Sequence, residues 1–274
     1  MNQSEIEKIK LLSKKIRKKI LDMSLYAGAS SSHFGGALSS VEILATLFGS
    51  VMNYNKKNFR DISRDRFILS KGHGCLVYYS MLNILGIITD DELKTFEKDG
   101  SKLLGHPVKN LESGIDFSTG SLGMGVSLAT GVALSLKKRN LGNKVFALIG
   151  DGECNEGVVW ETALSAPNLK LNNLTVIIDN NNFQQTGSNK DIMDISELEK
   201  KWSSFNWNTK KIDGHNIKDI YEALNAPSQD SPKVIICETI KGKGFSFSEN
   251  NNDWHHKIMS KDNYQIALKE LEND

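Results

Sequence analysis

Two short apolar segments in the middle of the chain constrain the fold more than any other feature. Residues 145–149 (Val-Phe-Ala-Leu-Ile) lead into Gly-Asp-Gly, and residues 174–178 (Leu-Thr-Val-Ile-Ile) lead into Asp-Asn-Asn-Asn. Each segment has the length of a strand, and the interval between them accommodates one crossover helix, which predicts a βαβ unit with parallel strands. Ligands of such sheets bind beyond the carboxyl ends of the strands, where both polar clusters fall.

The polar residues that follow these strands have the chemistry of a metal and diphosphate site. The Asp151 carboxylate and the Asn181 amide oxygen suit Mg²⁺ or Ca²⁺ better than zinc. Gly152 leaves its N–H unshielded at the start of the next helix, where anions bind. The alternative is a corner in which Asp151 only caps that helix. Gly-Asp-Gly alone favours the capping corner, since short motifs recur by chance. The Asn run one βαβ unit later favours the ligand site.

The rest of the chain predicts an α/β fold with a doubly wound, mostly parallel sheet flanked by helices, because strands alternate with helices. Further strands are expected at 65–70, 208–212 and 233–238. Helices are expected up to about residue 27 and then at 40–51, 75–85, 90–98, 119–138, 195–202, 217–224 and 261–272. There is no internal repeat and no linker, so residues 1–274 are predicted to form one domain. The polar tract 246–253 is expected to be mobile unless a ligand or partner orders it.

The composition argues against several classes of partner. The chain has 34 Lys and Arg against 33 Asp and Glu, a net charge of +1, which does not favour nucleic acid or an anionic membrane. No apolar run approaches the length of a membrane span. Glu5 and Glu7 lie among the N-terminal lysines, a pattern of an amphipathic helix and not of a signal peptide. The three isolated cysteines indicate reduced thiols and a cytoplasmic protein.

Four of the six histidines lie in predicted loops, beside glycine or at a helix break: His33, His73, His106 and His255. A single loop histidine is more often a solvated side chain than a catalyst. No pair has the spacing of zinc ligands. Four such rings in one chain nevertheless suggest a common site, in which imidazoles hydrogen-bond sugar hydroxyls and shuttle protons near neutral pH.

The motifs together resemble those of a known family. Gly150-Asp151-Gly152 followed by Asn180-Asn181 is similar to the thiamine diphosphate signature. Other segments resemble those of transketolases, namely Ser-Lys-Gly-His at 70–73, Gly-His-Pro at 105–107, Gly-Ser-Leu-Gly-Met-Gly at 120–125 and Trp-His at 254–255. Phe34 departs from the family's proline, and His256 departs from its glycine. The resemblance runs from the first helix to Lys257 and covers the first of the family's three domains.

The resemblance implies a role for each site residue. The implied metal ligands are Asp151, Asn181 and the backbone carbonyl of Phe183. The implied catalytic and sugar contacts are His33, His73, His106 and His255. The implied cofactor contacts are His73, Gly120, Leu122, Gly152, Glu156, Asn181, Lys241 and His255. Glu156 matches an acid of a carboxylate network that joins two active sites across the family's dimer.

The function implied is that of the N-terminal subunit of a split transketolase, which uses thiamine diphosphate and Mg²⁺. Such an enzyme transfers a two-carbon ketol unit from a ketose, usually a phosphate, to an aldose. The glutamate that activates the cofactor belongs to the family's second domain, so a C-terminal, pyrimidine-domain subunit is expected as partner in an α₂β₂ assembly. One alternative is another thiamine enzyme, either a 2-oxoacid dehydrogenase α subunit or a deoxyxylulose phosphate synthase-like fragment. The other alternative is a non-catalytic diphosphate-binding homologue.

Overall fold

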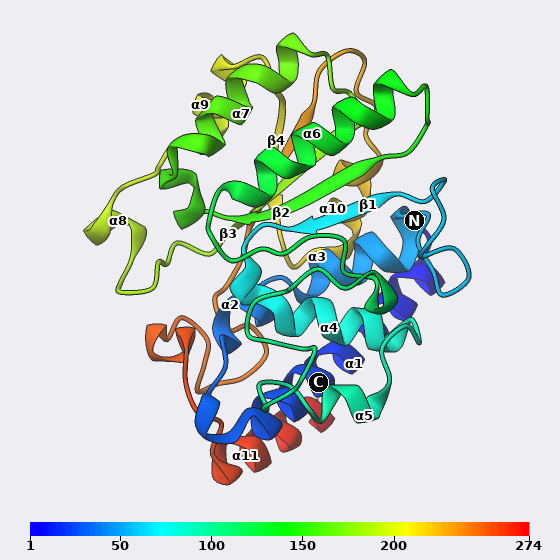
Figure 1. The fold of residues 1–274 in the computed structure, drawn as a ribbon. Helices are drawn as coiled ribbons and strands as arrows, with labels where there is room; N and C mark the ends of the chain where they lie inside the picture. The colour runs from blue at the N-terminus through cyan, green and yellow to red at the C-terminus, as the bar shows by residue number, and fades with distance from the viewer. Residues whose placement is uncertain (274) are drawn as a thin grey trace.

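A five-stranded parallel sheet forms the centre of the computed structural model, which describes residues 1–273 (Figure 1). The strand order is β1-β2-β3-β5-β4, and every neighbouring pair is parallel. The bounds are Arg66–Leu69 for β1, Val145–Gly150 for β2, Leu174–Asn180 for β3, Asn208–Asp213 for β4 and Lys233–Glu238 for β5. These segments match the predicted strands, and the α/β class is confirmed.

Helices cover both faces of the sheet, as a doubly wound fold requires. One face carries α6, α7 and α9, with bounds Met124–Lys138, Gly157–Asn168 and Leu198–Ser204 (Figure 1). The other carries α1, α3, α4 and α10, with bounds Gln3–Ala27, Val41–Thr46, Cys75–Ile84 and Ile217–Asn225. The C-terminal helix α11, Lys261–Asn273, packs on α1 and confirms the helix predicted at 261–272.

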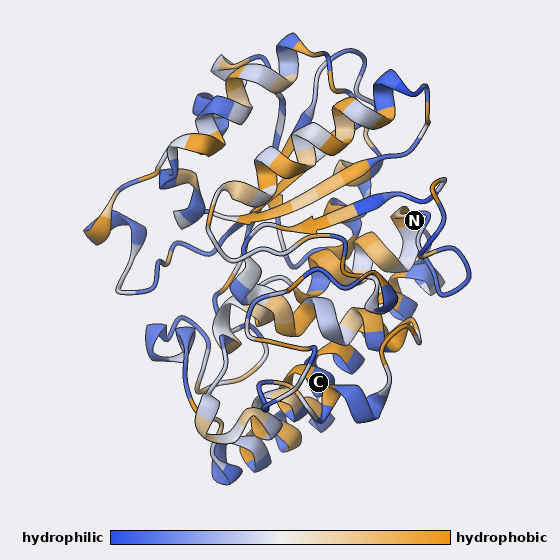
Figure 2. Ribbon diagram, viewed as in Figure 1, coloured by the Kyte–Doolittle hydropathy of each residue, from blue (hydrophilic) through white to orange (hydrophobic). Residues whose placement is uncertain are grey.

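The strand side chains alternate between two apolar clusters, one on each face. On β2, Phe146 and Leu148 pack into the cluster beneath α1 and α4, whereas Val145, Ala147 and Ile149 face α6 and α7. Because both faces are covered, the central strands β2 and β3 are mostly apolar (Figure 2). Their acidic and amide side chains lie only at the carboxyl end, and this position places them in the site.

Several predicted helices have different bounds. The segment predicted as a helix over 40–51 is α3 followed by a π-helical turn, Leu47–Val51, and a further helix α2, Phe34–Leu38, precedes it. The helix predicted over 90–98 is only α5, Asp90–Leu93. The helix predicted from residue 119 begins at Met124, because Gly120 and Gly123 have φ of 146° and 81°, values that an α-helix excludes. The short helix α8, Asn189–Ile192, was not predicted.

The segment Phe34–Val51 corrects one prediction made from hydropathy. By length and composition it is sufficient to cross a membrane, so the statement that no apolar run has that length is wrong. In the fold, 83% of this segment is buried inside the protein. Its side chains belong to the core beneath the sheet, including Leu38, Ile43 and Leu47, and this packing accounts for its apolar character.

The polar tract 246–253, which was expected to be mobile, packs against the glycine-rich loop before it. Ser248 is fully buried and its hydroxyl donates a hydrogen bond to the Gly242 carbonyl at 2.7 Å. The tract ends in a 3₁₀ turn, Asn252–His255. These contacts connect the tract to the loop beside the predicted site.

Candidate cofactor and substrate site

All of the predicted site residues line one cavity at the carboxyl end of the sheet. Its volume is about 350 Å³. The predicted residues in its wall are His33, His73, His106, Gly120, Leu122, Asp151, Gly152, Glu156, Asn181, Phe183, Lys241 and His255. The structure thus joins residues from nearly the whole length of the chain. Their convergence supports the predicted site, although it does not assign the role of each residue.

Asp151 lies directly after β2 and only 1% of it is exposed. Its Oδ1 accepts a hydrogen bond from the Gly152 N–H at 2.8 Å. Its Oδ2 accepts from the Asn182 N–H at 2.6 Å and from Asn189 Nδ2 at 2.8 Å. Gly152 opens a 3₁₀ turn, and α7 begins only at Gly157. Asp151 therefore caps this turn and not the helix that the capping interpretation predicted, and the three amides fix the direction of its carboxylate.

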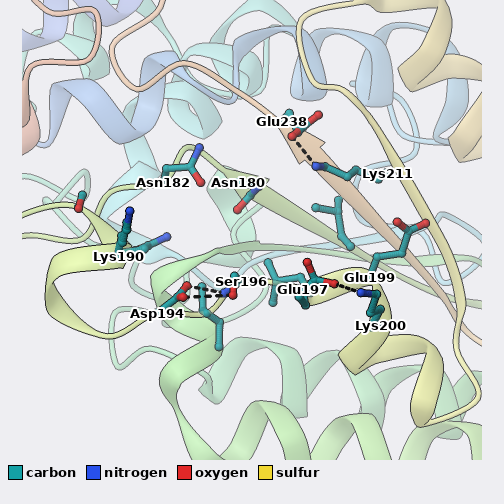
Figure 3. Close-up of a pocket in the computed structure, with 15 residues that line it drawn as sticks. Asn180, Asn182, Lys190, Asp194, Ser196, Glu197, Glu199, Lys200, Lys211 and Glu238 are labelled. Carbon is teal, nitrogen blue, oxygen red and sulfur yellow. Dashed lines mark hydrogen bonds and ion pairs between the residues drawn. The ribbon is translucent and has the colours of Figure 1, made fainter.

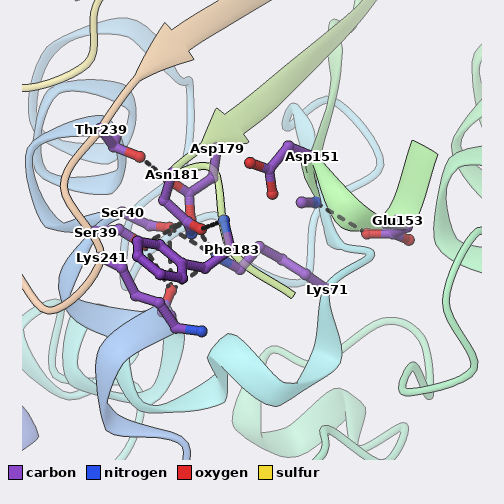
Figure 4. Close-up of polar contacts among 12 residues, drawn as sticks. Ser39, Ser40, Lys71, Asp151, Glu153, Asp179, Asn181, Phe183, Thr239 and Lys241 are labelled. Carbon is purple, nitrogen blue, oxygen red and sulfur yellow. Dashed lines mark hydrogen bonds and ion pairs between the residues drawn. The ribbon is translucent and has the colours of Figure 1, made fainter. Parts of the chain in front are cut away.

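No ion pair compensates the charge of Asp151 within residues 1–273. Burial and the neighbouring Asp179 raise the pKa of its carboxyl group to about 6. Asn181 is also buried, and its Nδ2 donates to Asp179 at 3.1 Å, which fixes the orientation of its amide oxygen. An uncompensated buried carboxylate beside an oriented amide oxygen fits Mg²⁺ or Ca²⁺. Figure 4 shows these side chains at the ends of adjacent strands.

The surroundings of Asp151 determine which groups could join it in holding a cation. Among residues 1–273, no group of three or more His, Cys, Asp or Glu side chains has the arrangement of a metal site. Asn181 and Phe183, the other two predicted metal ligands, line the same cavity as Asp151.

Asp179 forms a second buried carboxylate that sequence reasoning left without a role. It makes an ion pair with Lys71, and it accepts hydrogen bonds from Ser39 at 2.6 Å and from Thr239 (Figure 4). Burial alone would raise the pKa of Asp179, but Lys71 and the hydroxyl groups outweigh it and hold the pKa below its ordinary value. Asp179, like Asp151, lies at the carboxyl end of a strand, where ligands of parallel sheets bind. The pairing of Asp179 with Lys71 depends on the tertiary structure.

Glu153 is the other buried acid that was not predicted. It is 2% exposed, and it accepts hydrogen bonds from the backbone N–H of Gly123 at 2.7 Å and of Gly150 at 3.1 Å. The Ser70 hydroxyl also donates to it. Burial raises the pKa of the Glu153 carboxyl group. Glu153 thus joins three loops that line the cavity, and its position two residues after Asp151 was the available sequence signal.

The four predicted histidines are in contact around His33. Its ring centroid lies 5.6 Å from that of His73, 5.3 Å from His106 and 5.4 Å from His255. Burial lowers the pKa of His33 and of His255 to about 3, with further contributions from neighbouring imidazoles and Lys241. Burial also lowers the pKa of His73 and His106. At neutral pH each ring is therefore uncharged, with one donor and one acceptor nitrogen.

The two departures from the family pattern leave His33 in the cavity. Phe34 is fully buried in the core, where its ring lies 5.9 Å from Phe245 and 5.5 Å from Trp254. His256 is exposed and its ring centroid lies 4.3 Å from that of His33. The additional aromatic ring is accommodated by core packing, and the additional imidazole extends the histidine cluster outward.

A second cavity, of about 620 Å³, lies on the other side of the β3 end (Figure 3). Asn180 and Asn182 line it, whereas the intervening Asn181 faces the candidate site. Its charged side chains include internal pairs, such as Lys211 with Glu238 at 2.6 Å. No residue with a predicted catalytic or metal role lines this larger cavity, so the candidate site is the smaller one.

Comparison with known proteins supports the assignment suggested by these residues. Residues 10–272 match the family described as "Transketolase, thiamine diphosphate binding domain". The chain belongs to the transketolase family. The match spans all five strands of this transketolase domain and every residue of the candidate site.

Relatives of this transketolase domain include proteins of similar length. It is 39% identical to one of the subunits of apulose-4-phosphate transketolase from Actinobacillus succinogenes, over 100% of this chain and 98% of that protein. It is 38% identical to a 6-deoxy-6-sulfo-D-fructose transketolase subunit of Clostridium sp., over 88% of this chain and 89% of that protein. The human transketolase is 32% identical over 98% of this chain, which corresponds to 43% of that longer protein.

Solved transketolases have the same fold in part of their chains. The structure from Leishmania mexicana matches with a TM-score of 0.88 and 26% identity, over 96% of this chain and 41% of that chain. The structure from Campylobacter jejuni matches with a TM-score of 0.87 and 26% identity, over 99% of this chain and 43% of that chain. The protein thus spans about two fifths of these solved chains.

Proposed function

We propose that the chain is the thiamine diphosphate-binding subunit of a two-chain transketolase. The observation that carries this proposal is the single cavity in which Asp151, Asn181 and Phe183 meet His33, His73, His106 and His255. Ketol transfer between sugars requires two parts of this domain. One is a metal site that holds the diphosphate, and the other is a cluster of neutral imidazoles that binds the sugar hydroxyls. The two relatives of similar length, which are named as transketolase subunits, support the same conclusion.

The proposed partner is a separate chain that carries the pyrimidine-binding domain. The solved transketolases contain more than twice the length matched here, and the relatives of matching length are subunits. We expect an α₂β₂ assembly in the cytoplasm, with Glu156 near the interface because it is an exposed residue in the cavity wall. In this assembly the partner supplies the glutamate that activates the cofactor.

The residues of this chain have separate tasks in the proposed reaction. Thiamine diphosphate, when bound, supplies a carbanion nucleophile for the carbonyl group of the donor ketose. Asp151, Asn181 and the Phe183 carbonyl would hold Mg²⁺, which neutralises the diphosphate. Lys241 and Gly120 lie in the same wall, where the Gly120 backbone would contact the cofactor and Lys241 would position His255 beside it. The neutral imidazoles of His33, His73, His106 and His255 would bind sugar hydroxyls, because each ring has one donor and one acceptor nitrogen.

The proposed substrates are a donor ketose, usually phosphorylated, and an acceptor aldose. The relatives are named for apulose 4-phosphate and 6-deoxy-6-sulfo-D-fructose, so sugars outside central metabolism belong in the first assays. A 2-oxoacid substrate is the second candidate, and pyruvate turnover distinguishes it. The histidine cluster favours the sugar, because each of its rings offers a donor and an acceptor to hydroxyl groups.

The proposal is tested by a ketol-transfer assay with thiamine diphosphate and Mg²⁺. The chain is assayed alone and together with the pyrimidine-domain chain encoded beside it. We expect activity only in the mixture and its loss on Asp151→Ala. Activity of the isolated chain would contradict the need for a partner. Cofactor binding without turnover by the complete complex would favour the non-catalytic homologue instead.

A further inference from the structure

The loop 240–244, which carries Lys241, contacts an ionic network of Arg17, Glu42 and His215, none of which lines the candidate cavity. Glu42 lies between two cationic or polar partners, with Oε1 2.6 Å from Arg17 Nη1 and Oε2 2.9 Å from His215 Nδ1. Arg17 and Glu42 are 6% and 7% exposed. A buried charged group is stable in the interior only when it is paired and its hydrogen bonds are satisfied. The network therefore specifies one arrangement of α1, α3 and the loop after β4.

Both ends of the loop are attached to this network. The Ile240 N–H donates to His215 Nε2 at 2.9 Å, and Arg17 Nε donates to the Lys243 carbonyl at 3.3 Å. Gly244 has φ of 107°, and a Cβ there would lie 2.5 Å from Arg17 Nε. Because a backbone N–H can only donate, His215 Nε2 is the acceptor and its Nδ1 carries the proton shared with Glu42.

On the side of the loop that faces the cavity, Lys241 donates all three of its ammonium hydrogen bonds within the chain. Its Nζ lies 2.5 Å from Asn252 Oδ1, 3.3 Å from the Gln184 carbonyl and 3.0 Å from His255 Nδ1. Lysine has no acceptor, so His255 Nδ1 must accept this bond. The proton of the neutral His255 ring is then on Nε2.

We propose that the Arg17–Glu42–His215 network is a positioning device that acts through Lys241 to hold His255 in the Nε2–H tautomer. His255 then offers a hydrogen-bond donor, and not an acceptor, to whatever oxygen lies opposite it in the cavity. A phosphate oxygen or a ketose carbonyl meets that requirement, whereas a ligand N–H does not. His215 and His255 thus carry opposite tautomers, linked through the residues Ile240 and Lys241.

The tautomers are tested by NMR on the full chain labelled with ¹⁵N in its histidine side chains. His215→Gln and His255→Gln assign the two signals. In the unmodified chain we expect a single Nε2–H form for His255 and a single Nδ1–H form for His215. His215→Ala should convert His255 to a mixture of tautomers. His215→Gln, whose amide oxygen can accept from Ile240, should preserve the single form.

Matched variants separate positioning from general loosening of the fold. Glu42→Gln removes the acid of this network and should also give mixed tautomers at His255, which provides a second variant if His215→Ala does not fold. Asp116→Asn is the control, because it removes the acid of another buried pair, Arg64–Asp116 at 2.7 Å, and should leave His255 unchanged. A single His255 tautomer in both network variants, or an equal change in the control, would overturn the proposal.

The consequence for turnover rests on the proposed function. In the assembled enzyme, His215→Ala should raise KM for the donor ketose about tenfold, the effect of one misplaced hydrogen bond, with a smaller change in kcat. His215→Gln should restore KM. The NMR measurement needs neither partner nor sugar. A negative NMR result would therefore contradict the tautomer proposal and leave the proposed ketol transfer unaffected. Failure of the activity assay with intact tautomers would count against the proposed function alone.

Discussion

The carboxyl ends of β2 and β3 carry two buried carboxylates that differ in how their charge is compensated. Asp151 and Asp179 are 1% and 0% exposed. Among residues 1–273, only amide groups donate hydrogen bonds to the Asp151 carboxylate, and its pKa is raised to about 6. Lys71 instead neutralises Asp179, and the pKa of Asp179 is lowered. The difference supports the proposal that Asp151 binds a ligand cation, whereas Asp179 has a structural role, although both lie at the carboxyl end of a strand.

Among the substitutions, the largest expected effect on stability comes from removing the cation that pairs with Asp179. Lys71→Met leaves Asp179 buried without a cation and should lower the free energy of unfolding by about 3–5 kcal/mol, measured by urea denaturation. The double variant Lys71→Met/Asp179→Asn should recover much of the loss. Lys94→Met removes the exposed pair with Asp91 and is the control, with almost no expected change. Equal losses for both lysines would contradict the distinction.

Asp151, which has no cationic partner within residues 1–273, should instead stabilise the protein when it binds Mg²⁺. With thiamine diphosphate present and Mg²⁺ at a hundred times its Kd, the unmodified chain should gain about 2.7 kcal/mol of stability. Asp151→Asn should abolish this gain, because it removes the only buried uncompensated carboxylate charge among the metal candidates. Thermal unfolding with and without Mg²⁺ measures the difference. A variant that keeps the full gain would exclude Asp151 as a ligand.

A substitution of Asn189 tests the proposed metal site with a smaller expected effect. Its Nδ2 orients Asp151 from 2.8 Å, a position outside the direct ligand set. Asn189→Ala should weaken Mg²⁺ binding about 10–100-fold, measured by titration in the presence of thiamine diphosphate. Asn168→Ala removes an exposed amide that bonds only its own helix and should leave binding unchanged. If both substitutions had the same small effect, Asn189 would have no role in orienting the carboxylate.

A further prediction is a pH dependence of stability with two opposed contributions. The pKa of His33 and His255 is lowered from 6.5 to about 3. Between these values the unfolded chain binds protons that the folded chain does not. Stability should therefore fall as the pH drops below about 6.5, by up to about 1.4 kcal/mol per pH unit for each fully shifted ring. Urea denaturation between pH 4 and pH 8 measures this slope.

Asp151 opposes the histidines in part of that range. Its pKa is raised from 3.8 to about 6, so the folded chain keeps a proton that the unfolded chain has released. Its contribution to stability therefore falls as the pH rises from 3.8 to 6. Asp151→Asn should consequently steepen the acid loss over this interval. A shallower loss in the variant would mean that the carboxylate of Asp151 is already compensated.

Much of the fold was predictable from local pattern. The strands and the C-terminal helix were located correctly because buried parallel strands are continuous apolar runs bounded by polar residues. Errors arose where backbone conformation or burial decided the structure. Gly120 and Gly123 delay the start of α6, and Phe34 begins a helix because its ring packs in the core, neither of which hydrophobic periodicity can reveal.

The sequence alone determined which residue types follow which strands, and hence that Asp151 and Asn181 lie at one edge of a parallel sheet. The motifs also marked the four histidines. Only the tertiary structure decided that these rings meet around His33, that Lys71 neutralises Asp179, and that His215 supports the loop of Lys241. The physical reason is that charge compensation and ring contact depend on distances between residues far apart in the chain, which local sequence does not encode.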